Sequence, residues 1–216
     1  MNDKKNAVIA VAALEKLYPV AECSLCYEGD SFRLLVMAVL SAQCTDKRVN
    51  EVSVELFRRY PTPKLLAAAP EGELEEVIRS VGLFNSKAKN LRAAAKRLDE
   101  VYGGEVPSAM EDLLSLAGVG RKVANLLRGD LFGLGGIVAD THCIRITNRL
   151  GLCDSTRPEV VERTLSPLIP TEKQSDFCHR LVLFGRDICT ARAPDCARCP
   201  LAKFCKDNTS SRRQKV

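Results

Sequence analysis

The chain has 216 residues, enough for one large domain or for two small ones that share a core. Hydrophobic residues make up 46% of it with no low-complexity tract, so a real core can form. The longest apolar run, Leu34 to Leu40, is far below the ~18 residues that indicate a membrane span, so we expect no membrane partner. The net charge of +5 is unevenly spread, because seven Lys or Arg stand against two Asp from Cys189 to the end. Residues 84–97 add five Lys or Arg without an acid, and such positive faces bind phosphate, although a solvated helix face gives the same pattern.

The ten Cys would suggest disulfides in a secreted protein, but no signal peptide precedes them. We therefore expect a reduced, cytoplasmic protein. The scattered cysteines are interpreted as small core hydrophobes: Cys44, Cys143, Cys153 and Cys178. Cys23 and Cys26 form a lone CxxC, for which coincidence is preferred to a redox or metal role.

Helical periodicity runs through almost the whole chain, and no segment alternates as a strand does, so the sequence predicts an all-α fold. Phe32 to Leu40 is apolar on all sides, which suits a helix buried at the centre of a domain. Amphipathic helices are predicted at residues 10–17, 49–60, 74–81 and 85–101.

A glycine turn, Gly118-Val119-Gly120, separates two further predicted helices. Ser108 and Glu111 form a capping box that would begin the first helix, and the second covers Arg121 to Leu131. After an apolar link, another helix is predicted, with Asp140 as its N-cap and Gly151 as its end.

The glycine turn places bare backbone N–H groups at a helix N-terminus, which makes an anion site. Such a site binds a DNA phosphate without reading the sequence. Lys122 lies in the first turn of that helix, where the dipole and the neighbouring Arg121 disfavour a proton on its amine and favour a nucleophile. Asp140 could act as its carboxylate partner. On these residues alone the simpler interpretation is preferred, in which Lys122 contacts phosphate and Asp140 caps its helix.

Four cysteines near the C-terminus are close enough in sequence to share one inorganic centre: Cys189, Cys196, Cys199 and Cys205. Their spacing is C-x6-C-x2-C-x5-C. A structural zinc site usually has two short Cys pairs, whereas this segment has one, which favours an iron–sulfur cluster. A zinc knuckle and a disulfide pair are the alternatives.

Together these segments resemble the endonuclease III family of DNA glycosylases. Leu116 to Lys122 resembles the family's helix–hairpin–helix signature, and Asp140 to His142 resembles its catalytic Asp segment. Leu40 to Asp46 and Gly82 to Ala88 resemble two further motifs. The similarity, which includes the Cys spacing, runs from about Leu25 to Cys205.

The resemblance implies two helical domains with DNA between them. A six-helix domain would cover residues 24–134, and residues 1–23 with 135–216 would form a discontinuous domain that carries a 4Fe-4S cluster on the four cysteines. It also implies a monomer, located in the cytoplasm, and nucleoid-associated if the protein is bacterial.

The implied activity is that of a base excision repair DNA glycosylase with AP lyase activity. An oxidised pyrimidine would be flipped out of duplex DNA. Lys122 would attack the sugar carbon, Asp140 would assist, and β-elimination through a Schiff base would nick the strand 3′ to the abasic site. Gln43 and Leu83 match residues that fill the gap in the base stack, although alone they would be interpreted as a helix cap and a core residue. The remaining expected DNA contacts are Lys87, Gly118, Gly120, Arg121, Arg145 and Arg192.

Three positions depart from the family pattern. Ala117 stands where Pro is usual, and Ala139 replaces the usual Val. The loop after the first of the four cysteines, Ala191 to Asp195, is poorer in positive charge than is typical, with Arg192 as its best candidate contact. Two alternatives stay open: an adenine-specific mismatch glycosylase, which lacks a Lys at the position of Lys122, and a non-catalytic iron–sulfur DNA-binding module, which needs neither Lys122 nor Asp140.

Overall fold

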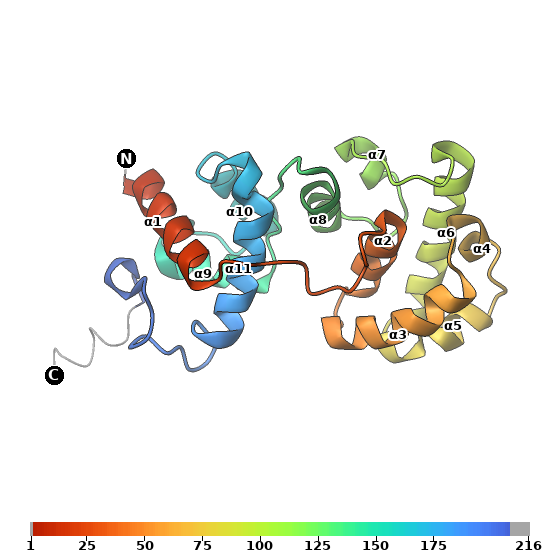
Figure 1. The fold of residues 1–216 in the computed structure, drawn as a ribbon, viewed down its shortest axis with the longest axis horizontal. Helices are drawn as coiled ribbons and strands as arrows, with labels where there is room; N and C mark the ends of the chain where they lie inside the picture. The colour runs from red at the N-terminus through yellow and green to blue at the C-terminus, as the bar shows by residue number, and fades with distance from the viewer. Residues whose placement is uncertain (1, 208–216) are drawn as a thin grey trace. The chain divides into compact units, whose positions relative to one another are not determined.

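The structure, a computed structural model, describes residues 2–207, with side chains from Lys4 onward. Every regular element in this range is a helix, which confirms the all-α prediction (Figure 1). By its internal contacts the chain divides into two compact units. We call Cys23–Phe132 the hairpin unit, and Met1–Glu22 with Gly133–Val216 the terminal unit.

The hairpin unit is built around one buried helix, α2 (Ser31–Leu40), of which eight residues are buried. This agrees with its apolar character on all sides. Three longer helices pack against it: α3 (Asp46–Arg59), α6 (Phe84–Tyr102) and α8 (Arg121–Phe132). Short helices complete the unit: α4 (Pro63–Ala67), α5 (Glu73–Val77) and α7 (Met110–Leu114).

Two local predictions in this unit are wrong. The segment 74–81 is not one helix, because α5 ends at Val77 and a separate 3-10 turn covers Arg79–Val81. The capping box at Ser108 does not form either: α7 begins one residue later, after Ala109, and no side chain caps it. Leu74, Ile78 and Val81 are all buried in the core, so the apolar pattern of the first segment reflects burial and not one continuous helix.

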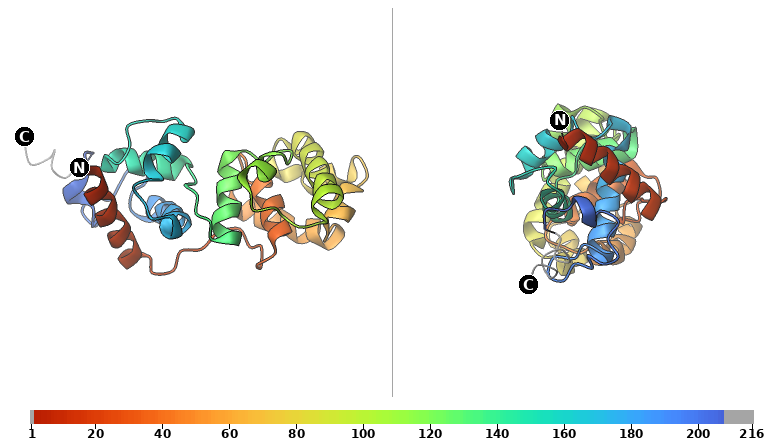
Figure 2. Two further views of the ribbon diagram at one scale, coloured as in Figure 1. Left: turned by 90° about the horizontal axis from the view of Figure 1, so that it is seen from above. Right: turned by 90° about the vertical axis from the view of Figure 1, so that its left-hand side faces the viewer.

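The terminal unit joins the first helix to the last long one. α1 (Asn2–Leu17) packs on α11 (Gln174–Asp187), beside α9 (Thr141–Leu150) and α10 (Pro158–Leu165) (Figure 2). Its core contains Leu14, Phe177 and Phe184, each at most 1% exposed.

Polar contacts fix the N-terminal segment in the same unit. Lys173 Nζ lies 2.8 Å from Glu15 Oε1, and the buried Arg180 donates from Nε to the carbonyl oxygen of Tyr18 at 3.0 Å. These contacts explain why Met1–Glu22 belongs with the C-terminal part of the chain.

The scattered cysteines mostly behave as predicted. Cys143, Cys153 and Cys178 are buried in the core of the terminal unit, whereas Cys44 is half-buried at the edge of the hairpin unit's core.

Candidate functional site

The glycine turn lies between α7 and α8 and packs on the hairpin unit's core through Leu116 and Val119, both buried. Gly118 has φ +82°, and a Cβ on it would lie 3.1 Å from the Cβ of Asn90 and 3.2 Å from Val39 Cγ1. A side chain at Gly118 would therefore be strained and crowded. With the inner side of the turn packed, Gly120 and the start of α8 remain exposed.

Lys122 is exposed on the first turn of α8, the second residue after Gly120. The first N–H groups of a helix have no partner within it, so they and the Lys122 amine are displayed at one end of α8. Ala124 is the first residue of α8 to donate back to the turn, to the carbonyl oxygen of Gly120 at 2.9 Å. The arrangement suits an anion held by backbone N–H groups beside an amine.

Asp140 forms the predicted N-cap of α9. Its Oδ1 accepts a hydrogen bond from the N–H of Cys143 at 2.7 Å, and the residue is half-buried. Asp140 belongs to the terminal unit, whereas Lys122 belongs to the hairpin unit.

Gln43 and Leu83 are exposed residues of the hairpin unit with left-handed backbones. Gln43 has φ +53° and Leu83 has φ +47°, and Leu83 is 61% exposed. Left-handed conformation is rare for non-glycine residues and is strained in a residue such as Leu. Gln43 lies in the turn between α2, which ends with Ser41 as its C-cap, and α3, which has Thr45 as its N-cap, so Gln43 is not a helix cap. Leu83 directly precedes α6 and is exposed, so it is not a core residue.

Lys87, expected to contact DNA, is only 4% exposed. Its Nζ donates to the carbonyl oxygens of Leu40 at 2.9 Å and Val81 at 2.8 Å. Burial lowers the pKa of Lys87. An ammonium enclosed in this way has no free path to a phosphate, which argues against the direct contact.

Arg145 is likewise held within the protein. Its Nη2 donates to the carbonyl oxygens of Cys189 at 3.0 Å and Gly185 at 3.3 Å. Burial lowers the pKa of Arg145, and the side chain fastens α9 to the end of α11. Arg145 is half-buried, so part of its guanidinium stays accessible, and Arg192 and Arg121 are exposed.

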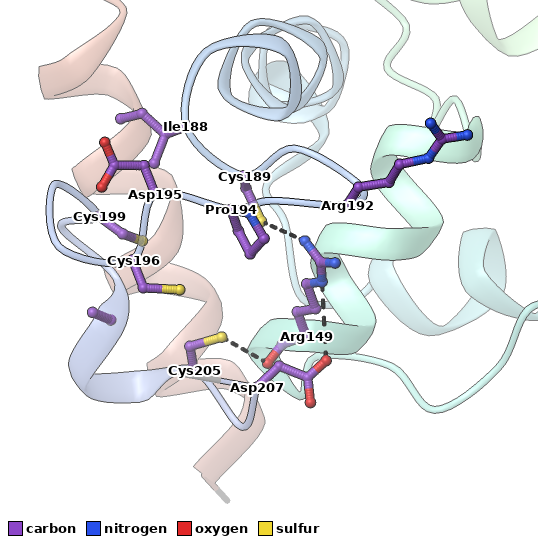
Figure 3. Close-up of a pocket in the computed structure, with 11 residues that line it drawn as sticks. Arg149, Ile188, Cys189, Arg192, Pro194, Asp195, Cys196, Cys199, Cys205 and Asp207 are labelled. Carbon is purple, nitrogen blue, oxygen red and sulfur yellow. Dashed lines mark hydrogen bonds and ion pairs between the residues drawn. The ribbon is translucent and has the colours of Figure 1, made fainter. Parts of the chain in front are cut away.

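The four C-terminal cysteines line one cavity of about 210 Å³ in the terminal unit: Cys189, Cys196, Cys199 and Cys205 (Figure 3). Burial raises the pKa values of Cys199 and Cys205, and the other thiols of the set raise them further by charge repulsion. Among the described residues no three His, Cys, Asp or Glu side chains are close enough to hold a single metal ion.

Arg149, on the last turn of α9, was missed from the sequence although it lines the same cavity. Its Nη1 donates to Cys189 Sγ at 3.3 Å (Figure 3). Nη1 also donates to the carbonyl oxygen of Thr190 at 2.8 Å, and Nη2 donates to that of Ala191 at 2.9 Å. From the other side, Cys205 Sγ donates to the Arg149 carbonyl oxygen at 3.3 Å. The only sequence signal was a cation at the end of a predicted helix.

No helix among the described residues is both long and apolar enough to cross a membrane.

The family model described as HhH-GPD superfamily base excision DNA repair protein matches residues 36–171 of the chain.

Sequence relatives extend over most of the chain. It is 45% identical over 209 residues to a Synechocystis protein named endonuclease III, covering 96% of this chain and 95% of the relative. It is 44% identical over 194 residues to Bacillus subtilis endonuclease III, covering 88% and 87%.

Two similar solved structures contain DNA. One is a trapped endonuclease III–DNA covalent intermediate, with a TM-score of 0.91 and 41% identity over 97% of this chain and 99% of that one. The other is a non-covalent endonuclease III–DNA complex, with a TM-score of 0.91 and 41% identity over 97% of this chain and 98% of that one.

Proposed function

The chain belongs to the HhH-GPD superfamily of base excision DNA repair proteins, as a DNA glycosylase/AP lyase of the endonuclease III type, and we propose that it removes oxidised pyrimidines from duplex DNA and nicks the strand 3′ to the abasic site. The observation that carries the residue assignment is the exposed Lys122 amine beside the bare N–H groups at the start of α8. The placement brings a nucleophile and a phosphate anchor to the same helix end.

In the proposed reaction the glycine turn holds a backbone phosphate through N–H groups, without sequence preference. The damaged nucleotide leaves the stack, and the Lys122 nitrogen forms a bond to the sugar C1′ as the bond from C1′ to the base breaks. The amine then loses a proton and the sugar ring opens: the C1′–O4′ bond breaks, O4′ takes up a proton, and a Schiff base between C1′ and the Lys122 nitrogen remains. Loss of a C2′ proton drives the β-elimination that breaks the bond from C3′ to its phosphate oxygen. A similar protein has been trapped as a covalent intermediate with DNA, which supports a covalent step in the reaction.

Asp140 has the complementary role in this proposal. Its carboxylate accepts the proton that the Lys122 amine loses and stabilises positive charge on the sugar. The N-cap bond to Cys143 holds this carboxylate by one oxygen, so its orientation is fixed by α9.

Gln43 and Leu83 are proposed to fill the space that the extruded nucleotide leaves. Their exposure and left-handed backbones support this, because strained, exposed side chains of this kind are common at functional sites. The glycine turn and the exposed Arg121 and Arg192 are proposed as backbone contacts.

The cysteines that line the cavity beside Arg149 are proposed to hold a 4Fe-4S cluster. Four thiols that line one cavity match in number and type the thiolate ligands of such a cluster. When bound, such a centre supplies four iron–thiolate bonds that fix the loop. The Arg149 guanidinium would then neutralise part of the thiolate charge.

A borohydride trap tests the reaction. The protein is mixed with duplex DNA that contains one oxidised pyrimidine, and reduction should fix the Schiff base as a covalent protein–DNA complex. Lys122→Gln should abolish both the complex and base release, whereas Lys64→Gln, at an exposed lysine of the same unit, should leave both unchanged.

Each outcome separates the alternatives. A covalent complex formed by Lys122→Gln at the normal rate would assign the nucleophile to another amine. Base release without any trapped complex from the natural chain would indicate a glycosylase without lyase activity, and binding without base release would indicate a non-catalytic module.

A further inference from the structure

Two exposed turns of the hairpin unit have strained backbones. Gln43 and Leu83 are both left-handed and exposed, so burial of their own side chains cannot hold the backbone in place. A non-glycine residue stays in this conformation only when its surroundings fix it. Local backbone bonds close each turn by itself, from the Cys44 N–H to the Ser41 carbonyl oxygen at 3.1 Å and from the Lys87 N–H to that of Leu83 at 3.0 Å. A connection between the two turns must come from groups behind them.

Lys87 reaches both turns from behind. Its Nζ donates to the carbonyl oxygen of Leu40, the last residue of α2 and three residues before Gln43, at 2.9 Å. It also donates to the carbonyl oxygen of Val81, two residues before Leu83, at 2.8 Å. The backbone N–H of Lys87 donates to the Leu83 carbonyl oxygen at 3.0 Å.

The chemistry of this contact suits a fixed connection. Leu40 ends a helix, where carbonyl groups lack intrahelical donors and where the helix dipole favours a cation. Lys87 is 4% exposed, so water cannot readily replace it, and its removal would leave buried acceptors unsatisfied. Burial lowers the pKa of Lys87, and the electrostatic effect of the half-buried Cys44 opposes that lowering.

We propose that Lys87 is a positioning residue that holds the turns of Gln43 and Leu83 in one fixed relation, so that both side chains enter the DNA stack together. The fixed relation of the turns stands on the contacts alone; the entry into the stack rests on the proposed function. One ammonium thereby fixes both turns in the same arrangement before DNA binds, which reduces the free-energy cost of ordering them on binding.

A mutant cycle tests the coupling. Lys87→Met, which keeps the stem and removes the ammonium, is made in the natural chain and in a Gln43→Ala/Leu83→Ala background. Single-turnover base release should fall roughly tenfold in the natural background and much less in the truncated one, because residues of one network are non-additive. 2-Aminopurine placed opposite the lesion should lose its fluorescence increase in Lys87→Met as it does in the truncated variant.

Lys89→Met is the matched control, two residues along α6 with an exposed amine. It should reduce the salt dependence of binding to undamaged duplex, whereas Lys87→Met should not. The same change of salt slope in both variants would overturn the proposal in favour of a direct phosphate contact. An equal loss of rate in both backgrounds would overturn it in favour of a general structural role. If Lys87→Met does not fold, Lys87→Gln takes its place in the cycle.

Hydrogen–deuterium exchange gives a readout that is independent of activity. In Lys87→Met, amides of residues 41–44 and 82–84 should lose protection together; unchanged protection, or loss in only one turn, would refute the connection. If the natural chain releases no base while both turns respond together, the proposed function fails and the connection by Lys87 stands.

Discussion

Lys122 and Asp140 each stand at the first turn of a helix, and that position determines what the side chain can do. The Lys122 amine is exposed at the positive end of α8, where a bound phosphate would also be held. Asp140 combines two roles that a substitution can separate, because its Oδ1 accepts the cap bond while its charge serves the reaction.

Asp140→Asn keeps an oxygen for the cap and removes the charge. We expect base release and nicking to slow by ~10²-fold or more, the scale of a positioned acid–base group, with little change in thermal stability. Asp140→Ala should lose the same activity and also ~1 kcal/mol of stability, because the cap is lost as well. Single-turnover kinetics and thermal unfolding measure the two effects. An Asn variant that acts at the normal rate would reduce Asp140 to a helix cap.

The contacts of Lys87 and Arg145 could not be predicted from the sequence. Their acceptors are carbonyl groups 47 and 44 residues away in sequence, for Leu40 and Cys189 respectively. A basic side chain in a basic segment predicts phosphate binding, and only the packing shows that these two point inward.

At the scale of elements, α5 is tied to α6 by one largely buried ion pair. Arg92 Nη1 donates to Glu75 Oε2 at 3.1 Å and Nη2 donates to the other oxygen, with side chains 20% and 15% exposed. Glu75 also accepts from the N–H of Gly72 at 2.9 Å, at the start of α5. The pair fixes a short helix that has little propensity to form alone.

This pair predicts a pH dependence of stability. Arg92 lowers the pKa of Glu75 to about 2, from an unfolded value of 4.5. The folded state therefore binds the proton less readily, so the stabilisation is complete above pH 4.5 and is lost as the pH falls toward 2. Glu75→Gln should cost ~2 kcal/mol at pH 7 and flatten this dependence in urea unfolding.

Glu55→Gln provides the control, because Glu55 pairs with Arg58 and Arg59 in solvent on α3 and should contribute far less. An equal effect of the two substitutions would show that burial of the Glu75 pair adds nothing.

The longer elements could be predicted because their patterns and their packing agree. The buried α2, the basic α6 and the capped α9 lie where periodicity and caps placed them. The short elements could not: α7 starts after Ala109 instead of at the Ser108 box, and α4 and α10 gave no periodic signal long enough to read.

At the scale of the molecule, the segment that carries the four C-terminal cysteines is held by hydrogen bonds to distant parts of the terminal unit. Arg149 of α9 bonds to the carbonyl groups of Thr190 and Ala191, and Lys206 donates its N–H to the Arg149 carbonyl oxygen at 2.9 Å. Tyr18 donates to Asp187 at the end of α11 at 3.0 Å. The spacing of the cysteines predicted a shared centre, but no sequence pattern predicted that Arg149 would connect the two ends of the loop.

The last prediction concerns what the four cysteines hold and what they stabilise. The purified protein should be yellow-brown, with iron and acid-labile sulfide in near equal amounts. Cys199→Ser should lower the iron content and destabilise the terminal unit by more than about 2 kcal/mol, because ligand binding to such a loop contributes folding free energy. Cys26→Ser, at an exposed cysteine of the hairpin unit, should change neither quantity. A colourless protein with one zinc per chain would establish the zinc alternative, and iron retained in full by Cys199→Ser would remove that cysteine from the ligand set.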